Sequence, residues 1–307
     1  MKTLTAPKIS LDLLQEVLPT GQLVTHHKGD TLCTIHKKVK HLFWLIDGNL
    51  DFYTQQQNPQ QEIQVAHCEI PFTTLGWNGF FTPERYTFSA KIASDQACFY
   101  KVPLKDFKAD IPQVNSLLLT IGQNNYHLLK NALCKQASLL QPRNFQIPKD
   151  EHYYVNASIE KSEIVQLMRR SPFLDQFSEL HLGKLAKLAQ RRDYEPNEII
   201  YAQDNASEGL YILIHGEVAI KRIKGKVDVS QRSISNSGFI FGWSSLLNLP
   251  DICNAITTEK TAVYFINHLD LHQLLEEDNR LKKRFYPRLI WLFGNQINAA
   301  FIRYTSL

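Results

Sequence analysis

Apolar and polar residues alternate along two stretches of the 307-residue chain, at 41–53 and 210–221. Alternation with a period of two is typical of a β-strand that buries one face. Asp47-Gly48 interrupts the first stretch, and His215-Gly216 interrupts the second. Such pairs favour tight turns, so each stretch predicts a β-hairpin. The same reasoning predicts further strands at 87–92, 97–102, 255–258 and 261–266.

The two stretches are copies of one sequence pattern. FWLIDGNL at 43–50 recurs as YILIHGEV at 211–218, and a Gly-Trp pair follows each copy, at Gly76-Trp77 and Gly242-Trp243. The first pair of segments is offset by 168 positions and the glycines of the second pair by 166. Two copies in the same order and nearly the same register predict two domains of one fold.

Helical periodicity flanks both strand-rich regions. Apolar residues recur at helical spacing along 104–137, 173–188 and 269–301, and a break is expected at Pro287. We therefore predict an α+β fold with two tandem jelly-roll-like β-rolls, each flanked by helices, and a long C-terminal helix.

The domain boundaries follow from the prolines and polar residues at 141–162, which are typical of a linker. The predicted domains are 1–138 and 166–307, joined by a linker at 139–165.

Composition narrows the class of protein. The chain is 44% hydrophobic with a net charge of +4, which indicates a globular protein rather than an evident nucleic-acid binder. No signal-peptide pattern or membrane-length apolar run occurs, so we expect a cytoplasmic protein without a transmembrane segment. The cysteines are scattered without a CxxC pair, which predicts reduced thiols: Cys33, Cys68, Cys98, Cys134 and Cys253.

The second copy carries the motifs of a known family. EGLYILIHGEV at 208–218 and GFIFG at 238–242 are followed by Leu246-Leu247, two strands and a long helix. In this order and spacing, 171–307 resembles the cyclic nucleotide-binding domain family, and 10–135 resembles it more loosely. The resemblance implies a regulatory binding domain, with cyclic AMP or cyclic GMP as its ligand and no catalytic residues.

The resemblance also implies a site. In the family, backbone N–H groups that follow a glycine hold the cyclic phosphate, an arginine pairs with it, and a glutamate binds the ribose. The glycine is present as Gly76 and Gly242, but tryptophan replaces the glutamate at Trp77 and Trp243. Indole has one N–H donor and no acceptor, so these residues either pack in the core or stack on a ring.

The arginine distinguishes the two copies. The family's position falls near Asp251 or Ile252 in the second copy, and no arginine or lysine occurs at 243–259. A carboxylate there would repel a phosphate, so the second pocket is predicted to be a poor cyclic nucleotide site. The first copy keeps Arg85, with Glu84 beside it as a competing partner.

The candidate ligand-binding residues come from both copies. They are Gly76, Trp77, Asn78, Arg85, Tyr86 and Thr87 in the first, and Gly242, Trp243, Ser244 and Ser245 in the second. Asn124 or Asn125, on the helix that follows the first roll, is a further candidate for contact with the base.

Other chemistries find little support in the residues. His26-His27 lies on a predicted strand, where neighbours point to opposite faces, so no metal site is expected. No nucleophile or phosphate-loop motif occurs, which favours a protein that is not an enzyme. The basic runs at 221–226 and 282–284 are either solvated surface or contacts for an acidic partner or nucleic acid.

The last helix is apolar around much of its circumference, from Leu289 to Ile302. One roll cannot cover so wide a surface, so we expect it to pack on the other domain or on another chain. About 40 residues follow Ile266, and the helix uses them, so no DNA-binding module is expected after it. Two functions remain: a sensor that signals to a protein partner or a homodimer through this helix, and a scaffold in which both pockets are vestigial.

Overall fold

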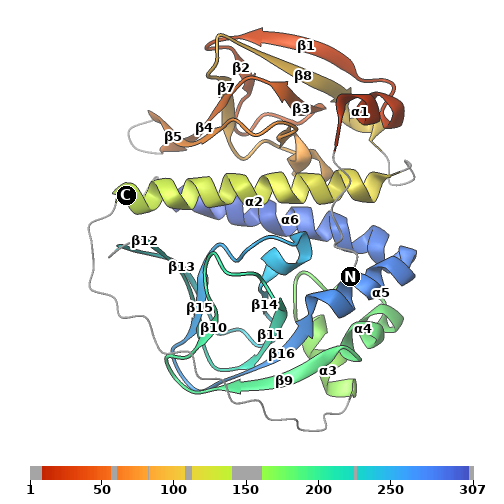
Figure 1. Cartoon of the computed structure of the whole chain (residues 1–307), viewed down its shortest axis with the longest axis vertical. Helices are drawn as coiled ribbons and strands as arrows, with labels where there is room; N and C mark the ends of the chain where they lie inside the picture. Colours follow the sequence, from red (N-terminus) through yellow and green to blue (C-terminus); the bar gives the residue numbers. More distant parts are fainter. Residues whose placement is uncertain are drawn as a thin grey trace. The chain divides into compact units, whose positions relative to one another are not determined.

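The computed structural model of the chain describes residues 9–56, 61–81, 83–107, 113–139, 161–224 and 227–303. They group into two compact units (Figure 1). The first contains the residues up to Leu139 together with those from Phe285 onward, and the second contains those between. This grouping differs from the predicted boundaries, which assigned the whole last helix to the second domain. The predicted linker lies largely outside the described residues.

The first unit begins with a short helix whose N-cap is Ser10, where the hydroxyl accepts a hydrogen bond from the Leu13 N–H at 3.2 Å. A β-roll follows, and then a long helix. The elements are α1 (Leu11–Val17), β1 (Gln22–His27), β2 (Thr31–Cys33), β3 (His41–Asp47), β4 (Leu50–Gln56), β5 (Gln61–Cys68), β6 (Thr74–Leu75), the 3-10 helix η1 (Trp77–Phe80), β7 (Ser89–Ile92), β8 (Gln96–Pro103), η2 (Leu104–Asp106) and α2 (Val114–Leu139).

The second unit places two helices before its roll and one after it, and the last helix starts here. The elements are α3 (Lys161–Arg169), α4 (Glu179–Ala186), β9 (Ala189–Tyr194), β10 (Ile199–Tyr201), β11 (Gly209–His215), β12 (Val218–Lys224), β13 (Val227–Ile234), β14 (Ile240–Phe241), the 3-10 helix η3 (Trp243–Leu247), β15 (Asn254–Thr257), β16 (Thr261–Asn267), α5 (His268–Glu277) and α6 (Asn279–Arg303).

Both rolls have the same strand topology. Two four-stranded antiparallel sheets form the first roll, in the orders β1-β8-β3-β6 and β2-β7-β4-β5. The second roll repeats these orders as β9-β16-β11-β14 and β10-β15-β12-β13. Even the irregularities correspond, because the β3–β8 register shifts after Leu45 and the β11–β16 register shifts after Leu213. The predicted α+β class and the pair of jelly-roll-like β-rolls are confirmed.

The two hairpins predicted from the alternating stretches are wrong. β3 pairs with β6 and β8, whereas β4 pairs with β5 and β7 in the other sheet. Gly48, with φ 98°, is therefore a corner at which the chain passes from one sheet to the other. Gly216 has the same role between β11 and β12. The chain bends in both cases, and the strands on either side take partners that are distant in the sequence.

The break in the last helical region falls earlier than predicted. Pro287 lies inside α6, and the chain breaks at Asp278, between α5 and α6. The Asp278 carboxylate accepts hydrogen bonds from the N–H groups of Arg280 and Leu281 at 3.1 and 3.0 Å, which caps the start of α6. Pro287 is the ninth residue of α6, where its ring removes one backbone hydrogen bond without ending the helix. Local sequence alone does not reveal the cap nine residues earlier.

The part of α6 from Phe285 onward belongs to the first unit, where it runs beside α2 (Figure 1). The Gln136 side chain on α2 donates from Nε2 to the Ala300 carbonyl at 2.7 Å. Phe301 packs edge-on against Phe88 of the first roll, with ring centroids 5.8 Å apart. The expectation that this apolar helix packs on the other domain is confirmed by these contacts. None of the helices in the described part of the chain is long and apolar enough to cross a membrane.

Candidate functional site

In each roll a glycine is followed by a 3-10 helix, and the two together are called the cassette. The cassette lies between β6 and β7 in the first roll and between β14 and β15 in the second. In the first roll, Gly76 adopts a left-handed conformation with φ 92° and is followed by η1. In the second roll, Gly242 does the same with φ 81° and is followed by η3. A Cβ atom on Gly76 would lie 2.2 Å from the His41 carbonyl oxygen, so this position admits only glycine.

The tryptophan after each glycine is buried. Trp77 is 2% exposed and Trp243 is 6% exposed, and neither indole Nε1 has a hydrogen-bond partner among the described residues. Trp243 packs against Phe173, with ring centroids 4.7 Å apart. Trp77 faces Gly294 of α6 so closely that a Cβ atom there would lie 2.1 Å from the indole ring. Of the two alternatives for these residues, the geometry favours packing.

The polar candidates of the first cassette only partly come together. The Asn78 amide donates from Nδ2 to the Thr87 hydroxyl at 3.1 Å, and Asn78 Oδ1 is buried without a partner. Tyr86 is buried, and this burial raises the pKa of its hydroxyl above the ordinary value. Arg85 is exposed, and its Nη1 donates to the His36 carbonyl at 2.7 Å. The guanidinium is thus held at the surface by a backbone oxygen.

The two asparagines on α2 are both buried. Asn124 donates from Nδ2 to the Phe72 carbonyl, which joins α2 to the loop before β6. The Asn125 amide nitrogen has no hydrogen-bond partner within the described residues. A buried amide without a partner is unusual in folded proteins, so Asn125 stays the stronger candidate of the two for contact with a ligand.

The second cassette supplies hydroxyl groups to an internal carboxylate. Asp251 is 2% exposed and accepts a hydrogen bond from the Ser207 hydroxyl at 2.9 Å and another from Ser244. Burial raises the pKa of Asp251 to about 7, although both hydroxyls oppose this rise. Ser245 is also engaged, since its hydroxyl donates to the Gly242 carbonyl at 2.8 Å.

A cation does reach this region, but from a strand that the sequence argument overlooked. Arg222 on β12 is buried, and its Nη1 donates to the Ile252 carbonyl. Its Nη2 lies 3.4 Å from Asp204 Oδ2. The sequence did indicate that Arg222 is buried, because every second residue of a strand lies on one face. Arg222 therefore shares a face of β12 with the apolar residues Val218 and Ile220.

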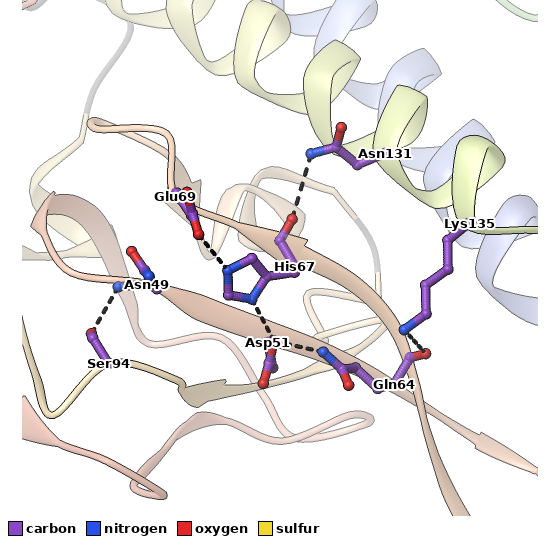
Figure 2. A network of polar contacts seen from close by, with 8 residues as sticks. All are labelled: Asn49, Asp51, Gln64, His67, Glu69, Ser94, Asn131 and Lys135. Carbon is purple, nitrogen blue, oxygen red and sulfur yellow. Dashed lines mark hydrogen bonds and ion pairs between the residues drawn. The ribbon is translucent and has the colours of Figure 1, made fainter.

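A charged cluster outside the cassettes joins β4, β5 and α2 in the first unit (Figure 2). His67 lies between two carboxylates, with Nδ1 2.7 Å from Asp51 Oδ1 and Nε2 3.0 Å from Glu69 Oε1. The hydrogen bond with Asp51 is the largest cause of the raised pKa of His67. Lys135 of α2 donates to the Gln64 carbonyl at 2.7 Å and so ties the helix to the edge strand β5. The cluster is partly exposed, since the His67 side chain is 43% exposed and that of Glu69 is 66% exposed.

Metal chemistry finds no support in the described segments, which contain no group of three or more His, Cys, Asp or Glu side chains placed to hold a metal ion. Along the same segments all five cysteines are free thiols. The chemistry that these sites permit is hydrogen bonding and charge pairing with a ligand.

Comparison with known proteins identifies the class of the second roll. Residues 191–278 match the profile of the cyclic nucleotide-binding domain, which describes a binding module. This match begins in β9 and ends at Asp278, so it contains both sheets of the roll and its cassette. Residues 191–278 are therefore similar to the cyclic nucleotide-binding domain family.

Solved structures resemble the chain at low identity. The regulatory domain of Toxoplasma gondii PKA with cAMP is 12% identical, with a TM-score of 0.35 over 87% of this chain and 86% of that one. A regulatory subunit of a cAMP-independent protein kinase A from Trypanosoma cruzi, bound to guanosine, is 13% identical, with a TM-score of 0.35 over 88% and 78%. A cyclic nucleotide-binding domain from Methylobacillus flagellatus is 19% identical, with a TM-score of 0.42 over 50% and 86%. TM-scores below 0.5 support no functional conclusion. No curated protein matches the chain.

Proposed function

We propose that the protein is a non-enzymatic regulatory protein made of two cyclic nucleotide-binding-type domains. The observation that carries this proposal is the repeated cassette: a left-handed glycine and a short 3-10 helix stand at the same place in both rolls. The family match of residues 191–278 supports it independently. Binding rather than catalysis is proposed because the family model that residues 191–278 match describes a binding domain.

The second roll is proposed not to bind a cyclic nucleotide. Asp251 already accepts the hydroxyl hydrogen bonds of Ser207 and Ser244, which a phosphate would otherwise attract. Arg222 is engaged by the Ile252 carbonyl and by Asp204. An entering phosphate would have to displace these contacts and would meet the Asp251 carboxylate, whose ionised form repels it.

The first roll is the proposed sensor, and the C-terminal helix is its proposed output. Trp77 adjoins the cassette glycine and contacts α6 at Gly294. A ligand that rearranges the cassette would therefore move the indole against the helix. Signalling to a protein partner or to a second copy of the chain through this helix then requires only that the two positions of α6 differ in affinity for that partner.

Titration calorimetry of the full chain with cyclic AMP and cyclic GMP tests the proposed function. We expect micromolar binding of one of the two, weakened at least about tenfold by Arg85→Ala, because a charge-assisted contact with the phosphate is lost. Arg169→Ala removes an exposed arginine from the second unit and should leave the affinity unchanged. Equal losses in both variants would contradict the role of Arg85.

A second candidate function is a scaffold in which both pockets are vestigial. The burial of Trp77 beneath Gly294 and the bond between Arg85 and the His36 carbonyl favour it. Under this alternative neither nucleotide releases heat at millimolar concentration. That result, obtained with folded protein, would end the sensor proposal and leave the scaffold.

The internal carboxylate of the second roll predicts a pH-dependent stability. The pKa of Asp251 is raised from 3.8 to about 7 in the folded state, so the folded protein holds this proton to a higher pH than the unfolded chain. Stability is therefore lost as pH rises from about 4 to about 7, by up to about 4 kcal/mol. Asp251→Asn, which cannot ionise, should be free of this loss.

Thermal unfolding at pH 5 and pH 8 measures the effect. The midpoint should fall further with pH in the wild type than in Asp251→Asn. Asp95→Asn, at an exposed turn, is the matched control and should behave as the wild type does. Identical pH dependence in the wild type and Asp251→Asn would show that the buried carboxyl titrates normally.

A further inference from the structure

A basic pocket lies in the second unit, between the beginning of α4 and the beginning of α6. Its volume is about 570 Å³, within the range of sites for small molecules. Four cationic side chains line it: Lys184, Arg280, Lys283 and Arg284. Asp278 is the single carboxylate in its lining, and no residue of the cassette at 242–247 contributes to it. The pocket is therefore distinct from the cyclic nucleotide site.

The one carboxylate is already saturated. Asp278 Oδ1 caps α6, and Asp278 Oδ2 accepts a hydrogen bond from Lys184 Nζ at 2.6 Å. This hydrogen bond with Lys184, together with the cap, lowers the pKa of Asp278 to about 2. Asp278 is thus ionised at every physiological pH, and its Oδ2 faces both Lys184 Nζ at 2.6 Å and His181 Nε2 at 3.9 Å.

The remaining cations lack a counter-charge. Arg280 and Lys283 are exposed and form no ion pair with any described residue. Arg284 donates from Nη1 to the Gln176 carbonyl at 3.2 Å, a backbone contact that does not neutralise it. The basic run at 282–284 is divided, because Lys282 is paired with Glu276 at 2.5 Å. Three positive charges on one short stretch of helix repel one another, and a bound anion relieves this repulsion.

Two further side chains indicate what else the ligand carries. His181 is 8% exposed, and its Nδ1 is buried without a hydrogen-bond partner. A buried polar atom in this state is costly, and a polar ligand group satisfies it. Leu180, also in the lining, is 68% exposed. It offers an apolar wall to a ligand that is more than an inorganic ion.

We propose that this pocket binds a small phosphorylated organic molecule, with the phosphate against the cations of α6 and the organic part against Leu180. Arginine guanidinium groups pair with two phosphate oxygens at once, and a lysine adds a compact charge, so Arg280 and Lys283 suit a phosphate dianion. None of the residues that line this pocket belongs to a cassette, so the proposed site would bind a second kind of ligand.

The test uses calorimetric titration of the full chain with phenyl phosphate and with inorganic phosphate at constant ionic strength. We expect saturable binding of both, severalfold tighter for phenyl phosphate because its ring covers Leu180. Lys283→Gln should weaken both anions about tenfold. Leu180→Ser should remove the advantage of phenyl phosphate and leave the affinity for inorganic phosphate unchanged.

Two controls separate this site from general charge effects and from the first cassette. Lys187→Gln removes an exposed lysine at the C-cap of α4, outside the pocket, and should bind both anions as the wild type does. Arg85→Ala should also bind them normally. An equal loss in Lys187→Gln and Lys283→Gln, or no saturable binding at tens of millimolar, would overturn the site. Equal affinities for the two anions in the wild type would overturn its assignment to an organic phosphate.

Discussion

Gly76→Ala is expected to lower the free energy of unfolding of the first unit by at least about 3 kcal/mol. Part of this loss, about 1–2 kcal/mol, comes from placing a side chain on a left-handed residue with φ 92°. The rest comes from overlap, because the new Cβ atom would lie 2.2 Å from the His41 carbonyl oxygen. That oxygen belongs to β3, which cannot move without disturbing its pairing with β8. Urea unfolding followed by circular dichroism measures the loss.

Gly29→Ala is the matched control for this prediction. Gly29 has φ 86°, nearly the same backbone conformation, but a Cβ atom there meets nothing within 4 Å. Its substitution should therefore cost only the conformational part, about 1–2 kcal/mol. Similar losses for the two variants would show that the close approach of the cassette to β3 is wrong.

Trp77→Ala is expected to destabilise the first unit by about 3–5 kcal/mol, the cost of emptying a buried site of this size. The indole is 2% exposed and lies between the first roll and α6. Trp291→Ala, on a partly exposed position of the same helix, should cost much less. The same unfolding measurement on both variants checks the difference.

A double-mutant cycle tests the contact itself. Gly294→Ala alone should destabilise the protein by about 1–3 kcal/mol, because the added methyl would lie 2.1 Å from the indole ring. Once Trp77→Ala has removed that ring, the same substitution should stabilise α6 by about 1 kcal/mol, since alanine favours helix over glycine. This reversal of sign requires direct contact. If the stability changes of the two substitutions simply add, the two residues are not in contact, and the link between the cassette and the C-terminal helix is wrong.

The proposed output through α6 gives Trp77 and Gly294 a role in signalling as well as in stability. If Trp77 transmits the state of the cassette to α6, Trp77→Ala should uncouple the helix from the first roll even where the ligand still binds. Transmission through Trp77 would also require glycine at position 294, because any larger residue would hold the indole away from the helix.

The comparison of sequence and structure separates local from long-range information. The Asp47-Gly48 pair correctly indicates that the strand ends there, but not that β3 and β4 lie in different sheets. Paired residues of β3 and β8 are between 51 (Asp47 and Cys98) and 62 (His41 and Pro103) positions apart, and no local pattern specifies them. In the same way, Pro287 marked the wrong position because a cap at Asp278 ends the preceding helix first.

The candidate sites show the same division. Because side chains alternate along a β-strand, Arg222 lies on the same face of β12 as Val218 and Ile220. Only the folding of the roll brings the Arg222 guanidinium to the Ile252 carbonyl. Ser207 and Asp251 are 44 residues apart and meet because both lie in loops at one end of the second roll. The predicted absence of a cation from 243–259 is correct for the sequence, but a cation reaches this region from elsewhere.

The repeat, the two β-rolls, the cassette glycines and the family resemblance all follow from the order of residues, because each rests on a pattern within one short segment. The grouping of α6 with the first roll, the burial of Trp77 against Gly294 and the capture of the Ser207 and Ser244 hydroxyls by Asp251 depend on the tertiary structure. Each of these joins residues far apart in the chain, and such contacts form only when the whole core packs.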